Sequence, residues 1–406
     1  MTDGGGTDPT EPPTADPGAI APVTEPAIPA GPGFERSAAV GAAPSAAAVF
    51  APDDPLVHLP QRGGRLLGAS FDVLTTARAD LRQASLYIGV ILLLGVGPLA
   101  FLLLGLATEH VGLGNIFFAD AIPRRFADTV NVTLTVTFVL AAVGYIVVLI
   151  EGQAVAIILL AGRLAHRPIT LRAAIVRSRV VFWRIFRGAL LIGIPLTALQ
   201  LAVQYPLTDG LSNPSQGASL LGTAVSTVAG WPFVYLGTGI VLGDVQATES
   251  ARRSTRLVRA RPWTALAIAV FAAIAGYLTS FGIGAADDVV QRLVTSLGLD
   301  ISAGGASLLA GTALVLVLVF AFGTLQFTVT AITIAPQVVA FLALTRYTGG
   351  IDQALAADSG RLAPSDAPTL VPVERVTFRW IPWRLLVASA LGVFLALLTL
   401  IKIDAG

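Results

Sequence analysis

Long apolar stretches alternate with short polar segments from about residue 86 to the end of the chain. Seven of these stretches approach or exceed the ~20 apolar residues with which a helix crosses a ~30 Å hydrocarbon core. They lie at residues 86–106, 132–162, 188–205, 219–243, 264–286, 306–345 and 385–401. The pattern therefore predicts an all-α fold, a polytopic transmembrane helical bundle of about seven spans.

The apolar stretch at residues 306–345 is long enough for two interpretations. It predicts either one long helix that bends near Pro336 or a hairpin of two spans. Short cytoplasmic loops carry an excess of Arg and Lys, so the charge of the loops helps to decide. From residue 61 onward, the segments outside the spans carry 4, 2, 7, 0, 5, 1, 5 and 1 of these residues in turn. This alternation favours a single crossing at residues 306–345 and a cytoplasmic N-terminus.

Composition divides the chain into four parts. Residues 1–60 are rich in Pro, Gly, Ala, Thr and acids, and such a segment buries too little apolar surface to fold, so we expect a disordered cytoplasmic tail. The tail lacks the basic start and apolar run of a secretory signal peptide. A six-span membrane domain at residues 61–345 follows. A cytoplasmic loop at residues 346–384 then leads to the seventh span and a short external end at residues 385–406.

An arginine-rich segment, LRAAIVRSRVVFWRIFR, lies before the third span at residues 171–187. At about 100° per residue its arginines fall on one side of a helix and most of its apolar residues on the other. The pattern predicts a helix that lies in the headgroup region and contacts anionic lipids. Comparable segments precede the first span (65–82) and the fifth (247–263). The candidate lipid contacts are Arg172, Arg177, Arg179, Arg184, Arg187, Arg252, Arg253, Arg256 and Arg259.

These basic segments suggest an internal repeat. The pair Arg253 and Ser254 in the third segment matches Arg177 and Ser178 in the second. We infer three units, each made of an amphipathic helix and two spans, with the seventh span as an addition. The alternative is that the positive-inside rule alone places such segments next to spans.

Three segments together resemble a known family. They are LRAAIVRSRVVFWRIFRGALLIGIP before the third span, its echo ATESARRSTRLVRARPW, and AFLALTRYTGGID after the sixth span. They resemble the membrane domain associated with glycerophosphodiester phosphodiesterases and its stand-alone bacterial relatives, over roughly residues 61–355. In that family a separate catalytic barrel gives the name, and only 60 residues follow Arg346 here, far fewer than the ~250 of a TIM barrel. The resemblance implies an all-helical domain of the bacterial cytoplasmic membrane and transfers no catalytic residue.

Residue types that carry chemistry are sparse. Hydrophobic residues make up 54% of the chain and charged residues 13%, and there is no cysteine, which excludes disulfides and thiolate chemistry. The histidines His58, His110 and His166 are far apart and match no metal-ligand spacing. No phosphate-binding loop, nucleophile elbow or dinucleotide fingerprint is present. We therefore expect no catalytic residue, no metal and no cofactor.

Glu151 is the most informative single residue, because a carboxylate within a span is costly and usually faces a bundle interior or a water path. One hypothesis is a polar site for a proton, a cation or a lipid amine, with Gln153 as a neighbour and Gln200, Gln204, Gln326 and Gln337 as further polar groups. The other is structural: the span ends near residue 150 and leaves Glu151 at an interface.

Asp244 directly follows the fourth span, where we expect its side chain to cap the basic helix that comes next. Glu249 adds a favourable negative charge to the first turns of that helix. Both predictions are structural.

Three functions are compatible with these features. The first is a non-enzymatic integral membrane protein that organises lipids or scaffolds a membrane complex, with anionic headgroups, a membrane protein or a second copy as partners. Because the arginines adjoin spans, they favour lipid and not nucleic acid. The alternative is a transporter or permease with a polar path that includes Glu151, which requires a water-accessible cavity. A lipid enzyme, which requires polar side chains that converge at one depth, is third.

Overall fold

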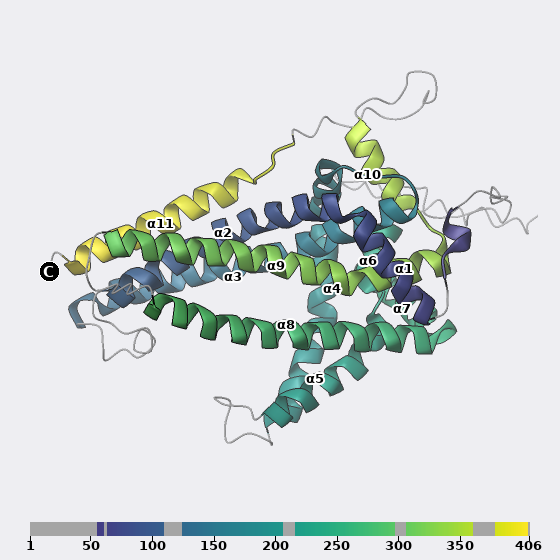
Figure 1. Cartoon of the computed structure of the whole chain (residues 1–406), viewed down its shortest axis with the longest axis horizontal. Helices are drawn as coiled ribbons and strands as arrows, with labels where there is room; N and C mark the ends of the chain where they lie inside the picture. The colour runs from purple at the N-terminus through teal and green to yellow at the C-terminus, as the bar shows by residue number, and fades with distance from the viewer. Residues whose placement is uncertain are drawn as a thin grey trace, which may run out of the picture. The chain divides into compact units, whose positions relative to one another are not determined.

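The structure, a computed structural model, describes residues 55–60, 63–108, 124–205, 216–296, 306–359 and 378–404. The chain divides into the units Met1–Pro52 and Asp53–Gly406, and all described residues belong to the second. Every regular element in these residues is an α-helix or a short 3-10 helix, labelled η (Figure 1). In chain order the elements are η2 (Pro55–His58), α1 (Gly63–Thr76), α2 (Arg78–Thr108), α3 (Arg124–Leu164), α4 (Leu171–Gln204), α5 (Gln216–Gly230), η6 (Trp231–Phe233), α6 (Leu236–Gly243), α7 (Ala247–Ala260), α8 (Pro262–Ser296), α9 (Ala306–Thr345), α10 (Gly349–Ser359) and α11 (Trp383–Asp404).

Seven helical stretches among the described residues are long and apolar enough to cross a membrane. They are Arg78–Leu106, Asp128–Leu164, Leu171–Gln204, Leu220–Gly243, Pro262–Thr279, Ala310–Thr345 and Trp383–Lys402. The predicted all-α class is therefore confirmed, and the number of long apolar stretches agrees with the predicted number of spans. Because α9 runs without a break from Ala306 to Thr345, one long helix and not a hairpin forms the sixth apolar stretch.

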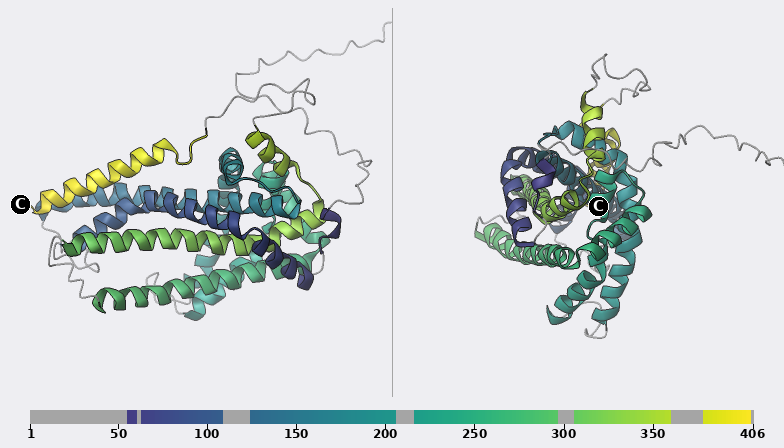
Figure 2. Two further views of the ribbon diagram at one scale, coloured as in Figure 1. Left: turned by 45° about the horizontal axis from the view of Figure 1, so that its top comes forward. Right: turned by 90° about the vertical axis from the view of Figure 1, so that its right-hand side faces the viewer.

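Helices α2, α3 and α9 pack along one another, and α11 packs on α2 and α3 (Figures 1 and 2). Glycines bring the backbones of these helices into contact at two places. A Cβ added to Gly95 of α2 would lie 2.8 Å from the Cα of Gly144 in α3. A Cβ added to Gly323 of α9 would lie 2.9 Å from the Cα of Gly89 in α2. Small residues at such crossings are typical of helices that pack within membranes.

Replacing Gly95 by Ala is expected to destabilise the protein by about 1–3 kcal/mol, as overpacking of a tight interface does. The atom in the way belongs to the backbone of Gly144, so no side chain can rotate to make room. The measurement is thermal unfolding of the detergent-purified full chain. Gly68→Ala in α1 is the control, because a Cβ there meets nothing within 4 Å and leaves stability unchanged or slightly raised. Equal melting temperatures for the two variants would contradict the close approach.

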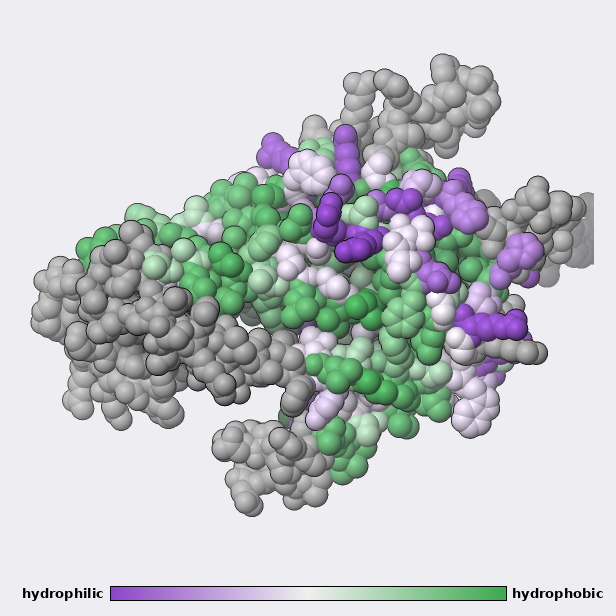
Figure 3. All heavy atoms as spheres, in the orientation of Figure 1, coloured by the Kyte–Doolittle hydropathy of each residue, from purple (hydrophilic) through white to green (hydrophobic). Residues whose placement is uncertain are grey.

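Exposed apolar surface and buried core lie in different parts of the long helices. In the first half of α3, Val132, Phe138 and Val143 are all more than half exposed. In its second half every residue from 154 to 161 is buried, with α1, α4, α6 and α10 packed around α3. Figure 3 shows hydrophobic side chains over α2, α9 and α11, and hydrophilic ones toward α1, α7 and α10. The exposed apolar zone is suited to contact with the hydrocarbon core of a membrane. A packed layer of helices lies next to it, at the arginine-rich end.

Two predicted segments contain short helices. Pro55–His58 forms η2 and Leu56 is buried in the core, so the folded part begins before residue 60. Residues 1–54 of the predicted disordered tail lie outside the described residues. The predicted loop at 346–384 contains α10, because Ile351 and Ala354 give this short helix an apolar face that is fully buried.

The three predicted units differ in structure. A short helix precedes the span in the first and third units, as α1 before α2 and α7 before α8. In the second unit the basic segment and the span form the single helix α4, so the predicted start of a separate span at residue 188 is wrong. The fourth span is divided into α5 and α6 at η6, because Pro232 cannot continue the helical hydrogen bonding. The three units therefore differ in how their helices are joined and divided, although their elements follow a similar order.

Candidate functional site

Glu151 lies in a closed polar contact between three helices. Its side chain is only 4% exposed, and Tyr87 of α2 donates a hydrogen bond of 2.9 Å to its Oε1. The Nε of Arg179 from α4 lies 3.5 Å from the same oxygen, and Nη2 of Arg179 donates to the Tyr87 hydroxyl at 3.2 Å. The carboxylate thus holds α2, α3 and α4 together.

Arg179 also binds the segment that precedes α11. Its guanidinium donates to the backbone carbonyls of Arg379 at 2.7 Å and Trp380 at 2.9 Å. The ring of Phe378 lies beneath the guanidinium groups of Arg172 and Arg179, at 5.1 and 5.9 Å. Trp380 is about half exposed, as an indole at a membrane interface is. This arrangement favours the hypothesis that Glu151 marks an interface and is structural.

Gln153 does not join Glu151. Residues two apart on a helix point in different directions, and the Gln153 amide packs against Gly237 of α6, where it occupies the space that a Cβ would need. It lines a groove between α3, α4 and α9. The two residues of the predicted polar pair, Glu151 and Gln153, therefore lie in separate places in the structure.

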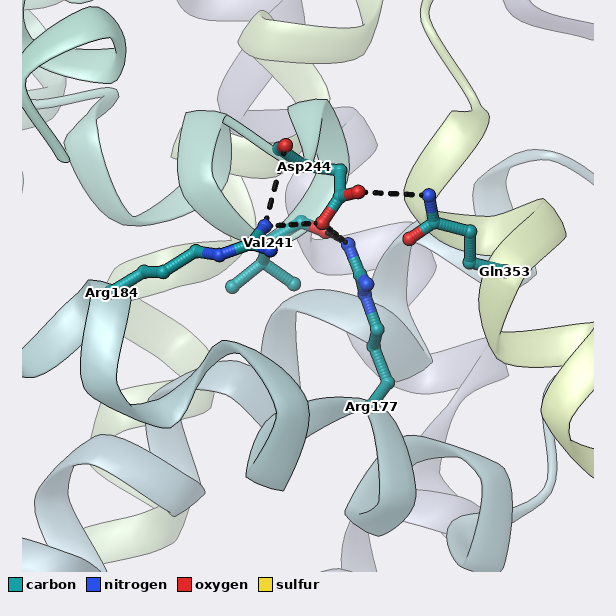
Figure 4. Close-up of polar contacts among 5 residues, drawn as sticks. All are labelled: Arg177, Arg184, Val241, Asp244 and Gln353. Atoms are coloured by element: carbon teal, nitrogen blue, oxygen red, sulfur yellow. Dashed lines mark hydrogen bonds and ion pairs between the residues drawn. The ribbon is translucent and has the colours of Figure 1, made fainter. Parts of the chain in front are cut away.

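Asp244 is the centre of a second polar cluster, drawn in Figure 4. It follows α6 in the left-handed conformation, with φ of 50°, which Asp adopts more readily than most residues. Its Oδ1 accepts hydrogen bonds from Arg177 at 2.9 Å and Arg184 at 2.6 Å, both from α4. Its Oδ2 accepts from Gln353 of α10 at 2.9 Å. Arg177 also donates to the carbonyl of Val241 at 3.1 Å, so this cluster joins α4, α6 and α10.

Charge balance keeps this cluster ionised. Partial burial by itself would raise the pKa of Asp244, but the hydrogen bond from Gln353 and the charges of Arg177 and Arg184 bring that pKa below its ordinary value. The Arg177 side chain is 5% exposed and needs the carboxylate as a counter-charge. The prediction that Asp244 caps α7 is wrong, since Gln246 holds the N-cap position and makes no side-chain cap bond. Glu249 does lie in the first turn of α7, as predicted.

The nine predicted lipid-contacting arginines divide into two groups. Arg177, Arg179 and Arg184 donate hydrogen bonds to acidic and carbonyl groups of distant segments, and of these three only Arg177 is buried. Their role as lipid contacts stays a prediction. The other six are exposed, namely Arg172, Arg187, Arg252, Arg253, Arg256 and Arg259. The matched pairs of the proposed repeat also differ, because Arg177 is buried and Arg253 is exposed beside Glu249 at 2.9 Å.

Helix α7 is held on the protein by its serine face. The hydroxyl of Ser250 donates to the carbonyl of Leu236 at 2.8 Å. The hydroxyl of Ser254 donates to the carbonyl of Pro232 at 2.8 Å and accepts from the backbone N–H of Tyr235 at 3.2 Å. Ser254 thus pairs with two backbone groups at the break between α5 and α6, and Ser250 adds a second contact with the start of α6. Sequence reasoning missed this role, although the spacing of the two serines, one helical turn apart, was a signal for a buried face.

The opposite face of α7 carries the four exposed arginines Arg252, Arg253, Arg256 and Arg259. Only Arg253 forms an ion pair among the described residues, with Glu249. Trp263, three residues after the helix, is 81% exposed. A basic face beside an exposed indole is the arrangement expected at a lipid headgroup surface.

The fold and its apolar surface define the class of the molecule as a polytopic membrane protein. Comparison with protein-family models, with characterised proteins and with solved structures gives no match. The resemblance to the membrane domain associated with glycerophosphodiester phosphodiesterases therefore stays a prediction. Among the described residues, no group of three His, Asp or Glu side chains is placed to hold a metal ion.

Proposed function

We propose that this chain is a non-enzymatic integral membrane protein whose arginine-rich end binds anionic headgroups at the cytoplasmic surface and so organises lipid around it. The observation that carries the proposal is α7, which is fixed to the protein by Ser250 and Ser254 and turns four arginines outward. A helix held in this way presents its charges in a constant geometry next to the apolar zone. Placement of this end in the cytoplasm rests on the alternation of arginines between loops.

The buried polar groups support a role without catalysis. Glu151 and Asp244 are both used in contacts that join helices, and neither is offered to a substrate. A transport path through Glu151 needs a carboxylate that water reaches, and the observed contact with Tyr87 and Arg179 leaves this one almost fully buried. These contacts of Glu151 favour the non-enzymatic role over a transporter. The predicted family resemblance adds no catalytic residue to the proposal.

Removing the charge of α7 is expected to weaken binding of anionic lipid. Each basic residue near an anionic surface contributes roughly 1 kcal/mol, so the triple change of Arg252, Arg256 and Arg259 to Gln is expected to lower affinity by up to about a hundredfold. The measurement is the rise in melting temperature of the detergent-purified full chain as phosphatidylglycerol is added, compared with phosphatidylcholine.

The matched control replaces the same three arginines by Lys. This variant keeps the charge and the length of the side chains, so it is expected to retain most of the preference for phosphatidylglycerol. If the Gln variant binds phosphatidylglycerol as well as the unaltered protein does, the α7 surface is not the lipid contact.

A further inference from the structure

A large groove lies between α3, α4 and α9. Helix α3 packs on both α4 and α9, whereas α4 and α9 make few contacts with each other. Figures 1 and 2 show the course of these helices. Its volume is about 990 Å³, near the upper end of the ~300–1,000 Å³ typical of ligand pockets. The walls are mostly aliphatic, with Ile146 and Leu149 from α3, Ile334 from α9 and Ile194 and Leu201 from α4. No charged side chain lines it. The walls are therefore suited to an apolar body, such as an acyl chain.

Two amide side chains interrupt this apolar lining. Gln153 of α3 and Gln337 of α9 both line the groove, and neither amide makes a hydrogen bond with the protein among the described residues. The hydroxyls of Thr330 and Thr333, by contrast, donate to carbonyls of their own helix. Both side chains are partly exposed, and in lipid, where water is scarce, an amide is stabilised by a hydrogen-bonding partner. The two amides therefore favour a ligand that has polar atoms as well as an apolar body.

The amide of Gln153 lies toward the end of the groove at which α4 is basic. Gln153 packs against Gly237 of α6, and Gly188 of α4 packs against the adjacent Leu236. Residue 187, next to Gly188, is an exposed arginine with no ion-pair partner among the described residues. At about 100° per residue, Arg187 falls within the arc of α4 that lines the groove. The lining of the groove thus combines neutral amides with an apolar wall, and the cationic Arg187 adjoins the lining residue Phe186 on α4.

We propose that this groove holds a glycerophospholipid. The phosphate pairs with Arg187, the ester carbonyls accept hydrogen bonds from the amides of Gln153 and Gln337, and an acyl chain lies along Ile194 and Leu201 of α4. Each part of the lipid meets the group that its chemistry requires: an anion meets a guanidinium, carbonyl acceptors meet amide donors, and methylenes meet aliphatic walls. The inference goes beyond the proposed function, because the groove does not involve the arginines of α7.

The test is photolabelling of the detergent-purified full chain with phosphatidylglycerol that carries a diazirine on one acyl chain. Mass spectrometry of the digested protein is expected to locate the label in residues 146–153, 186–201 and 330–337. Changing Gln153 and Gln337 together to Leu removes two hydrogen bonds and is expected to lower labelling of these segments about fivefold or more. Unlabelled phosphatidylglycerol is expected to compete, and unlabelled diacylglycerol, which lacks the phosphate, to compete at least tenfold more weakly.

A second variant tests occupation of the groove without touching the amides. Gly193 lines the groove and a Cβ there meets nothing within 4 Å, so Gly193→Leu fills space and is expected to abolish labelling while the protein stays folded. Gly276→Leu in α8 is the matched control, since Gly276 is equally open and lies outside the groove. Unchanged labelling in Gly193→Leu, or equal competition by diacylglycerol, would overturn the proposal. The Arg252, Arg256 and Arg259 variant is expected to leave this labelling unchanged, which separates the two lipid sites.

Discussion

Replacing Asp244 by Asn is expected to destabilise the protein by about 3–5 kcal/mol, the usual cost when one partner of a buried ion pair is removed. Arg177 would remain buried at 5% exposure without a counter-charge. Asn is similar in size and also tolerates the left-handed backbone at this position, so the change isolates the charge. The measurement is thermal unfolding of the purified full chain in detergent.

The control for this experiment is Asp72→Asn in α1, which removes a carboxylate from an exposed position and is expected to change stability by less than about 0.5 kcal/mol. The double change of Arg177 to Leu and Asp244 to Asn removes both charges of the buried pair. It is expected to cost less than the sum of the single changes, because no buried charge is then left unpaired. An Asp244→Asn variant as stable as the control would show that the cluster does not hold α4, α6 and α10 together.

The same cluster predicts a dependence of stability on pH. The pKa of Asp244 is lower in the folded protein than the ~3.9 of an unfolded chain, so its stabilising contribution is present above about pH 4. The contribution is lost as the pH falls through the lowered native pKa. The loss of melting temperature between pH 7 and pH 3 is therefore expected to be smaller in Asp244→Asn than in the unaltered protein.

Replacing Glu151 by Leu is expected to destabilise the protein by about 2–4 kcal/mol, somewhat less than for Asp244 because Arg179 is 31% exposed and partly solvated. Loss of the carboxylate leaves the Tyr87 hydroxyl and the Arg179 guanidinium without their shared acceptor. The measurement is again the melting temperature, together with the rate at which trypsin cleaves after Arg379 and Arg384. We expect faster cleavage, because Arg179 holds the carbonyls of Arg379 and Trp380.

Tyr87→Phe is the matched comparison, since it removes the hydrogen bond to Glu151 and the longer one from Arg179 but leaves the ion pair in place. Its expected cost is about 1 kcal/mol. If Glu151→Leu is no less stable than Tyr87→Phe and trypsin cleavage is unchanged, the contact with Arg179 contributes nothing and a structural role for Glu151 fails.

Hydropathy and charge predicted the membrane helices well, and for a physical reason. Whether a stretch of about twenty residues is apolar enough for lipid depends only on that stretch. The alternation of arginines between loops also predicted correctly that α9 is one helix. This helix is continuous from Ala306 to Thr345. Local patterns were less reliable at residue 188, where α4 continues through a predicted boundary.

Whether a polar side chain binds another part of the protein or remains exposed depends on segments that are far away in the chain. The helical projection of residues 171–187 placed all five arginines on one side and gave no reason to separate them. Arg177 and Arg184 donate hydrogen bonds to Asp244, which follows α6 in a left-handed conformation and lies beside them. Arg187 meets no such partner among the described residues and remains exposed. A helical projection shows which residues share a face of the helix. It does not show which neighbouring segment covers that face.

Local composition was enough to predict an all-helical protein with seven apolar stretches and arginines concentrated in alternate segments. It did not show that Glu151 lies between Tyr87 and Arg179, or that three arginines predicted to contact lipid join helices within the protein. Partners in those contacts come from different helices, and which side chains meet is set by how the helices pack. For the same reason, the basic face of α7 and the groove beside α4 lie in different parts of the structure.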